Sequence, residues 1–420
     1  MSDDDRGAAA DFARLDAWVD ANFDAEVRFL QALVRVPTDT PPGDNAPHAE
    51  ATARLLEGFG FAVERHAVPD SLVREHGLAS IVNLVVRRRY GDGPTIALNA
   101  HGDVVPPGEG WRHDPYGGEI ADGRIYGRAA AVSKSDFATY SFAVRALESL
   151  GAPLAGGVEL HLTYDEEFGG ELGPGWLLRE GIVKPDLLIA AGFSYQVVTA
   201  HNGCLQLEVT VHGRMAHAAI PASGVDALQG ATVILSALYA QNEIYRAVTS
   251  KVAGITHPYL NVGTIAGGTN TNVVPGKVVL RLDRRMIPEE DPAVVEATLR
   301  QVIAAAAAGR PGIAVEVRRL LLARALRPRA GNAALVAALR RHGEAVFGVP
   351  IEESGTPLYT DVRLYGEAGV PAAIYGAGPR TVLESNAKRA DEHLELADLR
   401  GATKVVARTL RELLGRRTAS

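Results

Sequence analysis

Short aliphatic runs alternate with helical patterns in the first half of the sequence and again near its end. A helix is expected over residues 16–36, where apolar side chains recur at helical spacing until a proline-rich loop begins. Strands are expected at residues 80–90, 95–103, 157–167 and 185–191, with helices at 137–150 and 175–180. Strands that alternate with helices predict an α/β fold with a mostly parallel sheet covered on both faces.

A different pattern begins near His201. Alternating strands and two longer helical patterns follow one another there, as in a compact α+β unit, and the strand-helix alternation then returns. A chain of 420 residues also exceeds the usual size of a single hydrophobic core. We therefore predict a catalytic domain formed by residues 1–202 and 315–420, interrupted by a smaller α+β domain of residues 203–314.

The charge and the composition of the chain exclude some kinds of binding partner. The formal charge of −7 argues against nucleic acid and against an anionic membrane surface, so a small-molecule substrate fits better. The acidic N-terminus has no signal-peptide pattern and no stretch is apolar enough to span a membrane, which predicts a cytoplasmic protein. Cys204 is the only cysteine, so any metal site would need histidine and carboxylate ligands.

Charged residues follow two of the expected strands, where ligands of parallel sheets gather. His101 and Asp103 are two residues apart, a spacing that lets the carboxylate orient the imidazole. Asp165, Glu166 and Glu167 follow the strand near residue 160 and precede two glycines. Surface turns without a function would give the same patterns. These residues are candidates for a site because their position after the strands and their chemistry both favour it.

The inserted domain carries a second group of candidates. Guanidinium and amide donors match the oxygens of a carboxylate, so an arginine, an asparagine and a histidine on one small domain can bind a substrate carboxylate. The candidates are His217, Asn270, Asn272, Arg284 and Arg285.

Taken in order, these segments resemble the dinuclear zinc amidohydrolases and exopeptidases that include acetylornithine deacetylase, succinyl-diaminopimelate desuccinylase, aminoacylase and carboxypeptidase G. Seven collinear blocks carry the resemblance, among them "AHGDVVPPGEGW", "YDEEFGG", "GRMAHAAIP" and "GGTNTNVVPG". It implies a catalytic domain interrupted by a lid domain that mediates homodimerisation. It also implies that His101 is a zinc ligand oriented by Asp103, that Glu166 is the general base, and that Glu167 is a second zinc ligand.

Three positions depart from that family's pattern. The bridging aspartate falls on Val132, the acid after the strand at 185–191 falls on Gly192 or Phe193, and the last histidine ligand falls on Lys388. Two retained ligands cannot hold two zinc ions, which ordinarily take three or four protein ligands each. His393 and Asp136 would need a shift in register to replace the missing ligands. The sequence therefore predicts a degenerate site with no metal and no other cofactor, zinc being disfavoured.

The rest of the family's apparatus is present. His217 is expected to stabilise an oxyanion, while Asn270, Asn272, Arg285, Asp361 and Arg363 are expected to bind a substrate carboxylate or support that binding. Lys388 places a fixed positive charge near the two glutamates, where it can stabilise developing negative charge. A Schiff-base role for Lys388 ranks lower, because a lysine beside carboxylates stays protonated.

These observations lead to one main hypothesis and three alternatives. The main hypothesis is a metal-independent enzyme that acts on a small amino-acid- or peptide-derived substrate with a free carboxylate. Its acid/base would be Glu166, and the reaction would be cyclisation, elimination, isomerisation or cleavage of an activated bond. The alternatives are a zinc-dependent amidohydrolase with non-standard ligands, a non-catalytic binding homologue, and a structural dimer partner of an active paralogue.

Overall fold

The computed structural model describes residues 3–415 and divides into two compact units. Unit 1 comprises residues up to 199, 328–354 and 360 onward, and unit 2 comprises residues 200–327 and 355–359. No helix in the described part of the chain has the length and apolar character that crossing a membrane requires.

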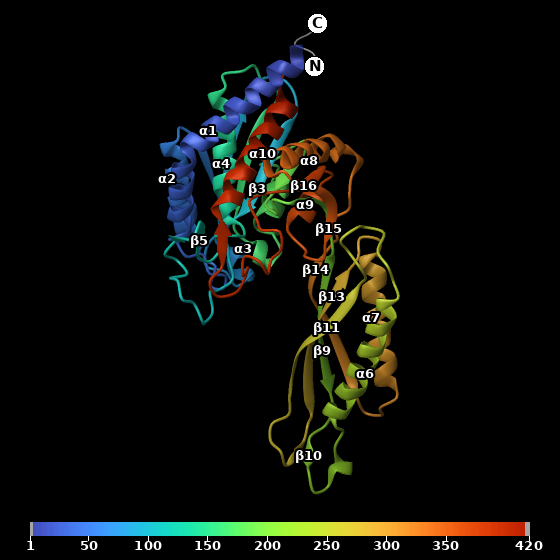
Figure 1. Ribbon diagram of the computed structural model, residues 1–420. Helices are drawn as coiled ribbons and strands as arrows, with labels where there is room; N and C mark the ends of the chain where they lie inside the picture. The colour runs from blue at the N-terminus through green and yellow to red at the C-terminus, as the bar shows by residue number, and fades with distance from the viewer. Residues whose placement is uncertain (1–2, 416–420) are drawn as a thin grey trace. The chain divides into compact units, whose positions relative to one another are not determined.

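Unit 1 contains an eight-stranded sheet with the order β1-β2-β6-β3-β7-β16-β8-β15 (Figure 1). Its strands are β1 (Val63–Ala67), β2 (Val82–Arg89), β3 (Thr95–His101), β6 (Gly157–Thr163), β7 (Leu187–Ala190), β8 (Gln196–His201), β15 (Glu352–Thr356) and β16 (Ala372–Ile374). The central strands β6, β3, β7 and β16 are parallel, while β1, β2 and β8 pair antiparallel with their neighbours. The predicted α/β fold with a mostly parallel sheet is thereby confirmed.

Helices and short strands complete unit 1. The helices are α1 (Asp3–Val34), α2 (Ala46–Gly58), α3 (Asp70–Glu75), α4 (Lys134–Ser149), α5 (Pro174–Arg179), α8 (Ala333–Phe347), α9 (Val362–Glu367) and α10 (Leu396–Leu414). A separate three-stranded sheet has the order β17-β5-β4, from β4 (Glu119–Ala121), β5 (Arg124–Tyr126) and β17 (His393–Glu395). The first helix begins well before residue 16, because apolar contacts such as that of Leu15 continue its buried face toward the N-terminus.

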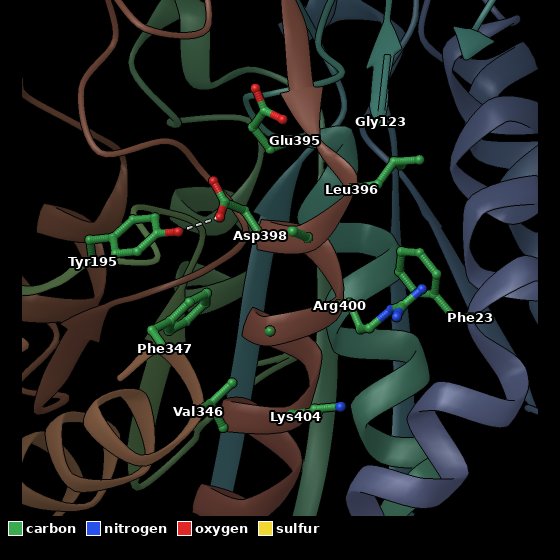
Figure 2. Close-up of a pocket in the computed structure, with 12 residues that line it drawn as sticks. Phe23, Gly123, Tyr195, Val346, Phe347, Glu395, Leu396, Asp398, Arg400 and Lys404 are labelled. Carbon is green, nitrogen blue, oxygen red and sulfur yellow. Dashed lines mark hydrogen bonds between the residues drawn. The ribbon is translucent and has the colours of Figure 1, made fainter. Parts of the chain in front are cut away.

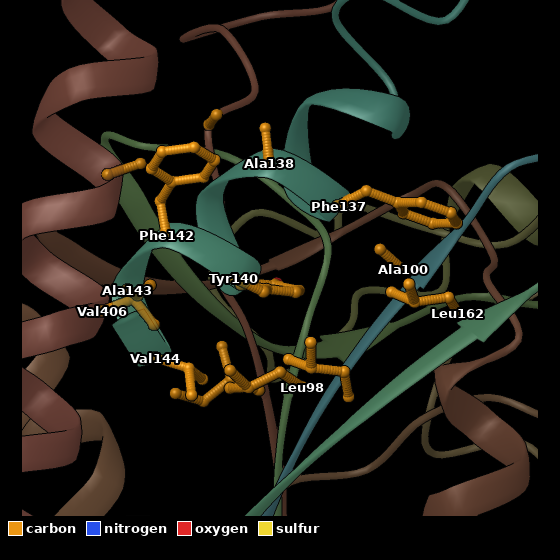
Figure 3. Packing of buried hydrophobic residues seen from close by; sticks show 14 of the residues in the cluster. Leu98, Ala100, Phe137, Ala138, Tyr140, Phe142, Ala143, Val144, Leu162 and Val406 are labelled. Carbon is orange, nitrogen blue, oxygen red and sulfur yellow. The ribbon is translucent and has the colours of Figure 1, made fainter. Parts of the chain in front are cut away.

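The core of unit 1 lies between the sheet and the helices α1, α4 and α10. Tyr140 and Val144 of α4 lie near Leu98 of β3, Phe137 of α4 lies over the carboxyl end of the same strand, and Val406 of α10 belongs to the same cluster (Figure 3). All five side chains are fully buried. Burial of such side chains, each worth roughly 1.5–3 kcal/mol, fixes α4 on the sheet and with it the loop that leads into α4 from residue 127.

Unit 2 is an antiparallel four-stranded sheet with two helices packed on one face. The sheet order is β11-β13-β9-β14, from β9 (Gly203–His212), β11 (Tyr259–Gly267), β13 (Lys277–Met286) and β14 (Ala314–Ala323), and α6 (Ala227–Arg246) and α7 (Pro292–Ala308) cover it. A two-stranded sheet joins β10 (Ala216–His217) and β12 (Val273–Val274). Strand β14 begins at the last residue of the expected range 203–314 and extends the unit beyond it, because its backbone pairs with β9 along almost its whole length.

Candidate active site

The site is built around Asp103, which is fully buried just after β3. Its Oδ1 accepts the backbone N–H of Glu166 at 3.2 Å and its Oδ2 accepts that of Glu167 at 3.0 Å. The parallel pairing of β3 with β6 brings these segments together, since His101 and Thr163 are partners in the register. Asp103 therefore fixes the short 3-10 helix Glu166–Phe168 that carries both glutamates, a role that its spacing from His101 did not reveal.

His101 closes the other side of this group. Its Nδ1 donates to the backbone carbonyl of Asp103 at 3.0 Å and lies 3.4 Å from that residue's carboxylate, while its Nε2 lies 3.9 Å from Oε2 of Glu166. Burial alone would lower the pKa of His101, but Asp103, Glu166 and Glu167 outweigh it and raise the pKa to about 10. The imidazole is thus a cation within the site.

Glu166 lies among several charged groups that act on its pKa in opposite directions. Burial raises its pKa, the cation of His101 lowers it, and the charges of Glu167 and Asp361 raise it further, to about 8. Asp361 itself is buried at the start of α9, where burial raises its pKa to about 6, and its Oδ2 has no hydrogen-bond partner in the described chain. Carboxyl groups accordingly crowd the space next to His101.

Lys388 forms an ion pair with Glu167, with 2.6 Å between Nζ and Oε2. Burial lowers the pKa of this lysine, but the charges of Glu167 and Glu166 prevail and raise it above its usual value. The ammonium therefore stays charged, which disfavours the Schiff-base role.

The two other departures from the family's pattern, Val132 and Gly192, have different surroundings. The hydroxyl of Ser133 bonds both the N–H and the carbonyl of His101, at 2.9 and 3.0 Å, and so places the neighbouring Val132 next to the histidine. Val132 remains 37% exposed. Gly192 has no room for a side chain, because a Cβ there would lie 2.3 Å from Cγ2 of Ile374.

Asp136 and His393, the other candidates to replace missing ligands, form hydrogen bonds with backbone groups instead. The carboxylate of Asp136 accepts the backbone N–H groups of Gly192 and Ala377, at 3.2 and 2.7 Å. His393 donates to the carbonyl of Asp391 at 2.9 Å and packs against Tyr126. Neither is oriented as a ligand by these contacts.

Arg363 is nearly inaccessible to solvent. Its guanidinium donates to the carbonyl of Gly169 and to the carboxylates of Glu171 and Glu367, at 2.9, 3.2 and 3.2 Å. These bonds hold the loop that follows Glu167. The structure therefore gives Arg363 contacts with protein groups, where the sequence predicted contact with a substrate.

The remaining predicted residues belong to unit 2 and fall into two groups. His217, Asn270 and Asn272 are exposed near the β10–β12 pair, where the Asn272 carbonyl accepts the N–H of Ala218 at 2.9 Å. Arg285 is near the other end of β13, pairs with Asp283 at 2.7 Å and lies over the ring of Tyr359. Arg284 is buried against Glu290 and Tyr245, which makes it structural.

The strand register separates these two groups within one copy of unit 2. Val278 and Arg285 of β13 are seven residues apart, which corresponds to more than about 20 Å of extended strand. His217 and Asn272 lie beyond the Val278 end, since β12 precedes β13. The three-residue carboxylate site predicted from His217, Asn272 and Arg285 is therefore not assembled within a single unit 2.

A separate cavity of about 590 Å³ lies in unit 1 along α10 (Figure 2). The Tyr195 hydroxyl donates to Asp398 at 2.6 Å, the guanidinium of Arg400 packs on Phe23, and Lys404 pairs with Asp20. None of the predicted site residues lines it. Its charged groups are thus occupied by protein partners and do not point to a ligand.

A His-Asp pair and a Glu-Glu pair at the carboxyl ends of neighbouring parallel strands, in an α/β unit interrupted by a second unit, match what the resemblance to peptidases and amidohydrolases implied. The chain belongs to the peptidase family M20/M25/M40, whose family model matches residues 97–412. The resemblance seen in the sequence is confirmed.

Three related proteins illustrate the family. Succinyl-diaminopimelate desuccinylase of Methylobacterium radiotolerans is 32% identical over 263 residues, which are 60% of this chain and 64%, less than two thirds, of that protein. The M20 metallo-carboxypeptidase Sso-CP2 of Sulfolobus solfataricus has a TM-score of 0.72 at 19% identity, with 92% of this chain and 98% of that chain covered. The YXEP protein of Bacillus subtilis, a dinuclear metal binding peptidase, has a TM-score of 0.68 at 17% identity, with 94% and 99% covered.

These relatives correct one prediction. A metallo-carboxypeptidase and a dinuclear metal binding peptidase share this fold and family, which contradicts the expectation that the protein uses no cofactor. The donor set of this chain nevertheless does not fit a dinuclear centre of the kind the resemblance implies. Residues 3–415 contain no cluster of three or more histidine, cysteine or acidic side chains arranged to hold a metal, and Lys388 occupies one side of Glu167.

Proposed function

We propose that the protein is a hydrolase that cleaves the amide bond of an N-acylated amino acid or a short peptide with a free carboxylate. The observation that carries the proposal is the group of Asp103, His101 and Glu166 at the carboxyl ends of β3 and β6. Membership of a peptidase family favours hydrolysis over the cyclisation, elimination or isomerisation considered from the sequence. The substrate of the desuccinylase relative, a succinylated diamino acid, belongs to the proposed class.

Glu166 is the proposed acid/base. In hydrolysis, a water oxygen bonds to the acyl carbon, the bond from that carbon to nitrogen breaks, and the proton of water passes through Glu166 to the departing amine. We propose that His101, 3.9 Å from Glu166, and Lys388, 2.6 Å from Glu167, stabilise the negative charge that develops on the acyl oxygen. Asp103 keeps Glu166 and Glu167 in place through their backbone N–H groups.

Recognition of the substrate is proposed to involve a second copy of the chain. Arg285 on the one side and His217, Asn270 and Asn272 on the other are separated within unit 2, so contact of both groups with one substrate requires different copies. We accordingly propose a homodimer through unit 2, which would be a lid or dimerisation domain. A cytoplasmic location completes the proposal.

The direct test is hydrolysis of N-succinyl-diaminopimelate, other N-acyl amino acids and dipeptides. Activity is measured on the purified protein, after chelation, and after addition of Zn²⁺, Co²⁺ or Mn²⁺, with the metal content determined in parallel. We expect wild-type hydrolysis in at least one of these conditions and a loss of about 10²- to 10⁴-fold in Glu166→Gln. Glu180→Gln, an exposed acid at the end of α5, is the control that should keep full activity.

The proposal fails if a cooperatively folded wild-type protein hydrolyses nothing in any metal condition. Saturable binding of a substrate without turnover would instead identify a non-catalytic binding homologue. Co-purification with an active relative would identify a structural dimer partner.

A further inference from the structure

The segment that carries Lys388 has an uncommon backbone conformation. Asn386, Lys388 and Asp391 have φ angles of 52°, 61° and 55°, in the left-handed region. A residue other than glycine pays a steric cost there and keeps the conformation only where its surroundings impose it. The position of Lys388 therefore depends on contacts that hold this segment.

Glu392 provides the contact with the backbone of Lys388. Its Oε2 accepts the Lys388 N–H at 3.4 Å and Nη1 of Arg128 at 2.5 Å, while its Oε1 accepts the N–H of Ala131 at 3.3 Å. Arg128 also donates from Nη2 to the carbonyl of Pro107 at 2.9 Å. Arg128 and Glu392 are 1% and 2% exposed, and ionic hydrogen bonds shielded from water in this way are strong.

The side chain of Lys388 has a different environment from its backbone. Its ammonium rests on Glu167, yet 59% of the side chain is exposed, so open space surrounds the stem. The contact of the ammonium with Glu167 therefore depends on where the backbone of Lys388 lies. Backbone bonds hold the flanking residues, from the Ala387 N–H to the Val382 carbonyl at 3.0 Å and from the Arg389 N–H to the Asn386 carbonyl at 2.8 Å. The buried pair adds the bond to the backbone of Lys388 itself.

We infer that Arg128 and Glu392 are positioning residues whose buried ion pair fixes the backbone of Lys388 and so keeps its ammonium on Glu167 in the site. Neither side chain touches the substrate. The inference rests on the proposed role of Lys388 in hydrolysis. It assigns a function to an ion pair that would otherwise only join the loop before α4 to the loop before β17.

The test removes both charges together in Arg128→Met/Glu392→Met, because removal of one partner would leave an unpaired buried charge. The matched control is Arg124→Met/Glu395→Met. That pair joins the directly opposed residues of β5 and β17 at 2.5 Å, its side chains are 41% and 39% exposed, and it does not contact Lys388. The two double variants thus change the same pair of chain segments with and without the proposed effect.

The first measurement is the rate at which acetic anhydride labels Lys388, determined by peptide mass spectrometry with the exposed Lys184 as internal reference. We expect labelling about tenfold faster in the Arg128/Glu392 variant, because a hydrogen bond between charged groups protects the amine by roughly that factor. The control should label at the wild-type rate. Wild-type labelling of Lys388 in a folded Arg128/Glu392 variant would overturn the inference.

The second measurement is kinetic. We expect kcat to fall as far in Arg128→Met/Glu392→Met as in Lys388→Ala, with KM little changed, and the triple variant to be no slower than Lys388→Ala alone. An additive loss in the triple variant would contradict the positioning role. If no substrate is hydrolysed even by the wild type, the proposed function fails while the labelling still decides the inference.

A milder variant replaces the double variant if the latter does not unfold cooperatively. Glu392→Gln retains the shape and one acceptor oxygen but weakens the bonds to Arg128 and to the Lys388 N–H. We then expect Lys388 to be labelled about threefold faster than in the wild type, a smaller gain because the weaker neutral bond remains. An unchanged rate in this variant would also overturn the inference.

Discussion

Glu26 makes the stability of unit 1 depend on pH in a way that a single substitution can expose. This residue of α1 is fully buried, accepts the hydroxyl of Thr403 on α10 at 2.5 Å, and has a second oxygen, Oε2, without a partner in the described chain. Burial raises its pKa from 4.5 to about 8, against the opposing effects of Thr403 and Arg400. The native state therefore holds a proton here that the unfolded chain releases above pH 4.5.

The size and sign of the effect follow from linkage. Because the pKa of Glu26 is higher in the native state than in the unfolded state, this residue contributes its full stabilisation of the native state below pH 4.5. That contribution is lost as the pH rises from 4.5 to about 8. At about 1.36 kcal/mol per pH unit, the loss is about 2 kcal/mol at pH 6 and about 4 kcal/mol at pH 8. Glu26→Gln does not ionise, so its stability relative to the wild type should improve by these amounts.

Urea unfolding of the wild type and Glu26→Gln at pH 4.5, 6 and 8, followed by circular dichroism, measures this difference directly. The gap between the two free energies of unfolding should widen with pH, whatever the fixed cost of the substitution. Asp24→Asn, which changes an exposed acid on the same helix, should run parallel to the wild type. Parallel curves for Glu26→Gln would refute the reasoning, since they would mean that the carboxyl ionises alike in both states.

Three further predictions concern the site. Gly192→Ala should lower the free energy of unfolding by about 1–3 kcal/mol in thermal or urea denaturation, because its Cβ would overlap Ile374; no destabilisation would mean that the strand end yields easily. Asp103→Asn should lower kcat by about tenfold or more while the fold persists, because an amide can accept only one of the two N–H bonds well, and an unchanged kcat would remove Asp103 from the site. Arg128→Met should lower the free energy of unfolding in urea titrations by about 3–5 kcal/mol, because it leaves Glu392 as an unpaired buried charge. The double variant with Glu392→Met should lose much less, and equal losses in the two variants would show that the unpaired charge is not the cause.

The fold could be predicted because its signals are local. Parallel strands buried on both faces are short aliphatic runs, and the half-exposed strands of unit 2 alternate, so each segment shows its type within a few residues. The end of unit 2 could not be placed in this way. Strand β14 looks like any strand at the start of a new segment, and only its pairing with β9, about a hundred residues earlier, assigns it to the second sheet.

Part of the candidate site was accessible for the same reason. His101, Asp103 and Glu166 follow strands in the sequence, and the rule that ligands gather at carboxyl ends brings them together without knowledge of the pairing. Arg128 and Glu392 carry no such signal. They are a charged residue in each of two loops 264 residues apart, and a sequence does not show which charged residues are buried or with whom they pair.

The three departures from the family's pattern differ in how firmly the structure fixes them. Gly192 is fixed by Ile374, because no side chain fits, whereas Val132 is partly exposed and could be exchanged with little change in packing. Lys388 lies between these cases, since its side chain is largely exposed and paired only with Glu167 in the described chain, but its backbone is bonded to Glu392. An attempt to restore the family's ligands should therefore succeed structurally at Val132 and Lys388 and fail at Gly192, so the loss of the acid after β7 is the change that the surrounding structure makes hardest to reverse.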